Sequence, residues 1–159
     1  MSLKSSTSLP EIRQKMEYYC SYQERCHLEV MQKLYGFSVS ATERDEIMVH
    51  LIQHNFLNEE RFAKTFALSK FHQKKWGKIR ITNELKQRQI SAYLITKGLQ
   101  EIPSHEYEET FETLTEKTWQ AITEKNALKK RKKFCDTLLR KGWESELVYE
   151  VVKKLEKNS

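Results

Sequence analysis

Apolar residues recur along most of the chain with the spacing of amphipathic helices. The pattern is clearest over residues 58–91. There we predict one helix with Phe62 and Phe66 on a shared face, a break at residues 76–77, and a second helix with Leu85 turned inward. No other stretch of the chain is as informative.

Signals for helix ends divide the remaining sequence into further helices. Asn58 has a side chain that caps helix N-termini, and Gly36 is typical of a residue that follows a helix. The second and third helices are expected to turn Tyr35 and Ile52 toward the core. With the apolar spacing, these signals predict nine helices: after Pro10, up to Gly36, after Ser40 or Thr42, after Asn58, over 78–89, after Ser91, over 105–125, over 126–142 and after Gly142.

The chain also contains an internal repeat. Residues 85–102 align without a gap on residues 138–155, at an offset of 138 − 85 = 53. The aligned pairs are Leu85–Leu138, Arg88–Lys141, Ile90–Trp143, Leu94–Leu147, Ile95–Val148, Leu99–Val152 and Ile102–Leu155. Chance similarity between amphipathic helices is the alternative, but the register holds across two helices and their turn.

These patterns predict an all-α fold of three tandem three-helix repeats that form an elongated, curved body. Four Gly and two Pro leave little turn chemistry for a many-stranded sheet, which agrees with helices. The expected units are a flexible leader over 1–9 and repeats over 10–57, 58–102 and 103–157.

Charge is concentrated in two basic segments. Residues 58–91 hold nine cations and three anions, and 9 − 3 = +6 equals the formal charge of the whole chain. Residues 129–133 and 140–141 form a second cluster, which also fits the solvated face of an amphipathic helix. A basic protein without a charged ligand is one interpretation, and an anionic partner is the other. The cations predicted to contact such a partner are Arg61, Lys70, Lys74, Lys75, Lys78, Arg80, Lys86, Arg88, Lys129, Lys130, Lys133, Arg140 and Lys141.

The sequence contains no recognisable catalytic set. His50 and His54 have metal-ligand spacing, but the zincin motif would require Glu where Leu51 stands, so we interpret them as surface histidines. We therefore expect no enzymatic activity, no cofactor and no metal site. The cysteines, which lack disulfide or zinc spacing, are Cys20, Cys26 and Cys135.

The N-terminus lacks the apolar segment of a secretory signal, and no apolar run approaches the length of a membrane span. These features and the expected reduced thiols favour a cytoplasmic location.

Residues 59–91 resemble the central segment of the RecX family. The shared features are an acidic pair followed by Arg-Phe-Ala, an aromatic-Gly turn, and a helix that ends in a Leu-basic-x-basic-Gly-Ile pattern. The matching residues are Glu59, Glu60, Arg61, Phe62, Ala63, Trp76, Gly77, Ile79, Leu85, Lys86, Arg88 and Ile90. The segment LLRKGWESELVYEVVKKL is similar to the last repeat of the family. This chain departs from the family at Lys78, where Pro is frequent, and at Gln89, where Gly is usual.

The resemblance covers about residues 10–157 and implies three tandem three-helix repeats. It also implies a regulator, expected to be a monomer, that binds the filament of RecA recombinase on single-stranded DNA. Such a regulator inhibits RecA in homologous recombination, DNA repair and the SOS response. The alternative is a helical protein that binds single-stranded nucleic acid without RecA, with basic helices contacting phosphates and neighbouring aromatic residues stacking on bases.

Overall fold

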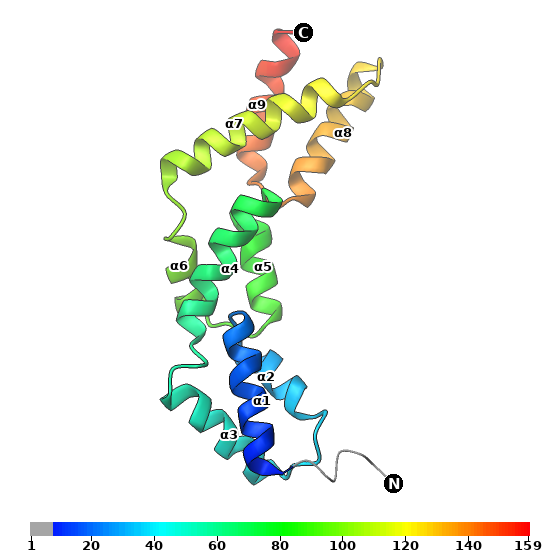
Figure 1. The fold of residues 1–159 in the computed structure, drawn as a ribbon. Coiled ribbons are helices and arrows are strands. Elements are labelled where there is room, and N and C mark those ends of the chain that lie inside the picture. Colours follow the sequence, from blue (N-terminus) through cyan, green and yellow to red (C-terminus); the bar gives the residue numbers. More distant parts are fainter. Residues whose placement is uncertain (1–7) are drawn as a thin grey trace.

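The computed structural model describes residues 8–159, and this part of the chain is all-α, without a strand (Figure 1). The predicted all-α fold is therefore confirmed. The helices are α1 (Leu9–Tyr22), α2 (His27–Leu34), α3 (Ala41–Gln53), α4 (Glu59–Lys74), α5 (Lys78–Gln87), α6 (Ala92–Leu99), α7 (Ser104–Ala121), α8 (Ala127–Arg140) and α9 (Ser145–Lys157).

Figure 1 shows an elongated body along which α1–α3, α4–α6 and α7–α9 follow one another, with α1–α3 at one end and the end of α9 at the other. The predicted boundaries at 57/58 and 102/103 fall in the connections before α4 and α7. Of the predicted leader, residues 1–7 lie outside the described part. Ser8 caps α1 and Leu9 is already helical, so the helix begins one residue before Pro10.

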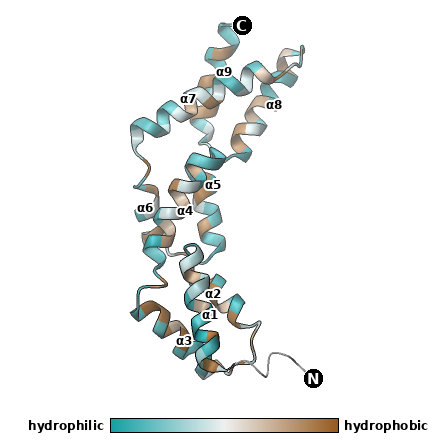
Figure 2. Ribbon diagram, in the orientation of Figure 1, coloured by the Kyte–Doolittle hydropathy of each residue, from teal (hydrophilic) through white to brown (hydrophobic). Residues whose placement is uncertain are grey.

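The buried side chains form two separate clusters. One lies within α1–α3 and includes Ile12, Met16 and Leu51. The other runs continuously through α4–α9, so the middle and third helix groups share a core. In Figure 2 each of these groups shows hydrophobic and hydrophilic residues along the same helices, as amphipathic packing requires.

Two side chains expected to face the core are exposed. Tyr35 is 61% and Ile52 is 44% exposed. Because α2 ends at Leu34, Tyr35 is its C-cap residue and Leu34 is the buried residue of the last turn. In α3 the buried residues are Ile47 and Leu51, four apart, which leaves Ile52 beside the inward face.

The alignment of residues 85–102 with 138–155 corresponds to equivalent positions in the structure. Leu85 and Leu138 are both fully buried. Each is followed by a turn residue with positive φ, Gln89 at 61° and Gly142 at 92°. The positive φ of Gln89 is the conformation that Gly, usual at this position in the resembling family, adopts without strain.

The start of α5 is bonded to the end of α8. The Gly77 amide donates to the Lys141 carbonyl at 2.9 Å, and the Ile79 amide donates to the Gly142 carbonyl at 3.0 Å. The Lys78 amide between them donates to the Tyr107 hydroxyl at 2.9 Å. These acceptors from the third group satisfy amides that a helix start leaves without intrahelical partners. Gly77 offers α5 no side-chain cap.

The contact requires glycine on both sides. A Cβ atom on Gly77 would lie 2.4 Å from the Gly142 carbonyl oxygen, and one on Gly142 would lie 2.2 Å from Cβ of Arg80. The indole of Trp143, buried beside this contact, donates to the Lys75 carbonyl at 3.0 Å. The α4–α5 and α8–α9 turns are therefore held together backbone to backbone.

Replacement of Gly77 by Ala tests this contact. We expect Gly77→Ala to lower the free energy of unfolding by about 1–3 kcal/mol, because the new methyl group meets backbone atoms that cannot move independently. Denaturant unfolding followed by circular dichroism measures the change. Gly36→Ala is the control, since its Cβ would meet only the Lys33 carbonyl oxygen, at 3.1 Å. Equal stability of the two variants would contradict the close approach.

Candidate functional site

The contact between α5 and α8 gathers cations that lie far apart in the sequence. Arg80 donates from Nη1 to the Arg140 carbonyl at 3.3 Å, and Lys141 donates from Nζ to the Lys74 carbonyl at 3.2 Å. The end of α4, the start of α5 and the end of α8 therefore present one group of cations. We call these the junction cations: Lys74, Lys75, Lys78, Arg80, Arg140 and Lys141.

Aromatic rings fix part of this group. The Arg80 guanidinium lies 4.2 Å from the centre of the Trp76 ring, and Lys78 Nζ lies 4.7 Å from that of Tyr107. Lys74, Lys75 and Arg140 are exposed. Within residues 8–159, none of the junction cations forms an ion pair with a carboxylate. Their charge is thus available to an external anion.

Tyr107 links the third group to this surface, a role that sequence reasoning missed. Its hydroxyl accepts from the Lys78 amide and donates to Glu144 Oε1 at 2.5 Å. Burial, and then the hydrogen bond to Glu144, raise the pKa of Tyr107, so the phenol stays protonated and remains a donor. The apolar spacing predicted only that Tyr107 faces inward.

The cations at the other end of α8 have internal partners. Lys133 lies 3.3 Å from Glu124, and Lys130 Nζ lies 4.0 Å from the centre of the Trp119 ring. The Asn126 amide, and then Lys133, lower the pKa of the Glu124 carboxyl. Lys129 is exposed. Lys129 precedes Arg140 by eleven positions (140 − 129 = 11), which is about 16 Å along a helix.

Three further predicted cations lie on α4 and α5. Arg88 pairs with Glu84 at 3.1 Å, and its guanidinium lies 4.8 Å from the centre of the Phe66 ring. Lys70 Nζ lies 5.4 Å from the centre of the Trp76 ring, whereas Lys86 is exposed. Lys86 is therefore the one of the three that has neither an ion pair nor a ring partner in the part of the chain that the structure describes.

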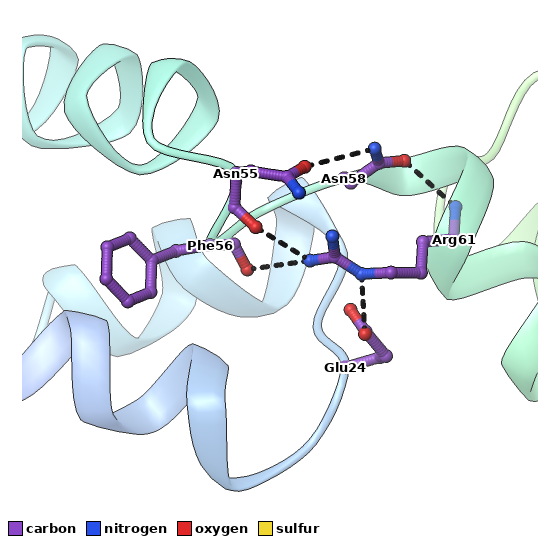
Figure 3. A network of polar contacts seen from close by, with 5 residues as sticks. All are labelled: Glu24, Asn55, Phe56, Asn58 and Arg61. Atoms are coloured by element: carbon purple, nitrogen blue, oxygen red, sulfur yellow. Dashed lines mark hydrogen bonds and ion pairs between the residues drawn. The ribbon is translucent and has the colours of Figure 1, made fainter.

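Arg61 lies at the connection between the first and middle groups (Figure 3). Its Nε donates to Glu24 at 2.6 Å, and its Nη2 donates to the Asn55 and Phe56 carbonyls at 3.0 and 3.3 Å. The Asn58 side chain accepts from the Arg61 amide at 2.9 Å and thereby caps α4. Arg61 thus holds the groups together, and we leave it out of the binding surface proposed below.

The neighbouring acidic residue has a similar structural role. Glu59 accepts from the His27 amide at 3.0 Å, which supplies a cap for the start of α2. The sequence had shown Glu59 only as a first-turn residue of its own helix. The long separation of the two residues in the chain left no local signal for this contact.

The histidines and cysteines are engaged in packing and internal bonds. His50 Nε2 lies 2.7 Å from Glu17 Oε2. Burial raises the pKa of the Cys20 and Cys26 thiols to about 11, so both are protonated at neutral pH. Among residues 8–159 no three metal-ligating side chains converge, and none of the helices is long and apolar enough to cross a membrane.

Comparison with known proteins relates the chain to one family. Residues 58–99 match the model of the second three-helix domain of RecX. Regulatory protein RecX of Bacillus cytotoxicus is 25% identical over 130 residues, which are 82% of this chain and 48% of that protein. Regulatory protein RecX of Oceanobacillus iheyensis is 24% identical over 139 residues, 87% of this chain and 51% of that protein. The chain spans about half the length of these curated relatives.

Solved structures show the same fold. A crystal structure of RecX from Lactobacillus salivarius has a TM-score of 0.78 at 22% identity and covers 93% of this chain and 96% of that one. A second crystal structure, of a regulatory protein RecX, has a TM-score of 0.80 at 20% identity. It covers 92% of this chain and 73% of that one.

Arg61→Met tests the structural role of this cation. We expect it to lower the free energy of unfolding by about 1–3 kcal/mol, because the partly buried Glu24 carboxylate and two carbonyls lose their donor. Lys64→Met on the same helix removes only a pair with Glu60 at the surface and is the matched control, with an expected loss below about 0.5 kcal/mol. Chemical denaturation of both variants measures their free energies of unfolding. Equal losses of stability in the two variants would contradict the structural role of Arg61.

Proposed function

With the predicted resemblance confirmed, this chain is a RecX-family protein, and we propose that it binds the filament of RecA on single-stranded DNA and inhibits RecA. The inhibited activities are ATP hydrolysis and recombination during DNA repair and the SOS response. The chain acts as a regulator rather than an enzyme. This proposal extends the regulatory role named for the related RecX proteins to the present chain.

The junction cations are the observation that supports the proposal most strongly. They belong to two helix groups, yet backbone hydrogen bonds hold Gly77 and Ile79 against Lys141 and Gly142. A preorganised cluster binds phosphate or carboxylate groups without first ordering flexible segments. The elongated body in Figure 1 is suited to lie along a helical, negatively charged groove.

The remaining cations contribute unequally in this proposal. Lys86 and Lys129 are exposed and extend the charged surface. Lys70, Arg88, Lys130 and Lys133 already contact rings or carboxylates, so we expect smaller contributions from them. The alternative function is binding of single-stranded nucleic acid without RecA, which predicts tight binding to naked DNA with a steep dependence on salt.

Charge reversal at two exposed junction cations tests the surface. We expect Lys74→Glu with Lys75→Glu to raise the concentration for half-inhibition of RecA ATPase on single-stranded DNA by about tenfold, since two favourable charges become repulsive. The matched control is Lys153→Glu with Lys157→Glu, which also reverses two exposed lysines near a helix end. The assay is run at low salt, where surface charges act most strongly.

The outcomes separate the proposals. Unchanged inhibition by the junction variant would exclude this surface. Absence of inhibition by the wild-type chain would exclude RecA regulation, and tight binding to naked DNA would then favour the alternative. Equal losses in the junction and control variants would assign the effect to net charge rather than to a site.

A further inference from the structure

A groove on the first helix group, far along the chain from the junction cations, has the composition of a ligand site. Its volume is about 740 Å³. One wall is a face of α1, where residues 11, 15, 18 and 22 follow at helical spacing. The lining residues are Glu11, Gln14, Lys15, Tyr18, Tyr19, Tyr22, Arg25, Lys33 and Phe37.

Two of the tyrosines are not used by the fold. Tyr18 is 70% and Tyr22 is 72% exposed, and neither belongs to the core cluster of α1–α3. Their ring centres lie 6.3 Å apart with the planes tilted by 34°. Two aromatic rings that lie beside each other and are exposed to solvent have apolar faces that a planar ligand can cover.

Tyr19, which lies between Tyr18 and Tyr22 in the sequence, differs from them because two cations of the groove lie against its ring. The Arg25 guanidinium lies 3.7 Å from its ring centre and Lys33 Nζ lies 5.4 Å from it. Arg25 is held there by a hydrogen bond of 3.0 Å from its Nε to the Tyr19 carbonyl. Both cations therefore lie against Tyr19, in the same groove that Tyr18 and Tyr22 line.

The charge of the groove favours a polyanion. Lys15, Arg25 and Lys33 oppose the single carboxylate of Glu11, so the lining carries 3 − 1 = +2. Lys15 Nζ lies 5.8 Å from the centre of the Phe37 ring, which places this cation on the aromatic surface as well. Exposed rings with cations beside them match the two parts of a nucleotide, its base and its phosphate.

We propose that this groove binds single-stranded DNA, with Tyr18 and Tyr22 stacking on unpaired bases and Lys15, Arg25 and Lys33 facing the phosphates. Double-stranded DNA is disfavoured because its base faces are covered by neighbouring base pairs. The inference concerns direct binding of DNA and is independent of the proposed inhibition of RecA. An extended proline-rich or acidic peptide would also suit aromatic and basic walls, and the test separates it.

The test uses the full chain, without RecA, and a fluorescently labelled oligothymidylate, followed by anisotropy. We expect Tyr18→Ala with Tyr22→Ala to weaken binding by about tenfold or more, the range found for loss of base–aromatic stacking. Tyr18→Phe with Tyr22→Phe keeps the rings and should retain the wild-type affinity. Tyr93→Ala with Tyr149→Ala is the matched control, since these tyrosines are also exposed and lie on α6 and α9.

An abasic oligonucleotide of the same length separates stacking from charge. It retains the phosphates, so we expect the wild type to bind it more weakly than oligothymidylate and the Tyr18/Tyr22 alanine variant to bind it as the wild type does. The inference would be overturned if the wild type bound both oligonucleotides with equal affinity, or if the alanine variant bound oligothymidylate as tightly as the wild type does. A peptide would then be the better candidate ligand of the groove. If the wild-type chain inhibits RecA ATPase but does not bind oligothymidylate, the groove proposal fails and the proposed function stands. If it binds oligothymidylate but does not inhibit RecA ATPase, the proposed function fails and the groove proposal stands.

Discussion

The hydrogen bonds between the start of α5 and the end of α8 are the constraint on which the middle and third helix groups depend. α5 begins at a glycine that offers no capping side chain, so its first amides need acceptors from elsewhere. The carbonyls of Lys141 and Gly142 supply them, as does the hydroxyl of Tyr107. Because Lys78 provides one of these amides, the Pro frequent at this position in the family would remove a hydrogen bond that this chain makes.

The first helix group is attached by a different kind of contact. It has its own buried cluster, and its link to α4 consists largely of polar contacts through Arg61 and Glu59. Two apolar contributions cross the connection, since Cys26 is buried with the cluster of α4–α9 and Leu28 packs against it. Polar attachment at partly exposed positions is weaker than a shared core, so local opening is expected here before elsewhere.

The two proposed surfaces follow from this construction. The rigid contact between the middle and third groups assembles the junction cations, while the first group carries the aromatic groove with its own cations. An elongated body with separate contact regions can bind an extended polyanion at several points, and linked contacts raise the overall affinity above that of either alone.

Local sequence was sufficient for the helices and much of the core. Helical spacing identified Phe62, Phe66 and Leu85 as inward residues, and side-chain caps such as Asn58 marked helix starts, because both effects act within one or two turns. The same local reasoning failed at Tyr35, where α2 ended one residue earlier than the pattern suggested.

From the sequence, the candidate site could be predicted only as a list of cations. The sequence by itself determined that the chain is helical, repetitive and basic, because spacing, register and charge are properties of neighbouring residues. Only the tertiary structure decided that Arg61 is a structural clamp and that Lys74 and Arg140 share one surface. Those outcomes depend on two turns meeting through glycines sixty-five positions apart (142 − 77 = 65), a contact that no local pattern records.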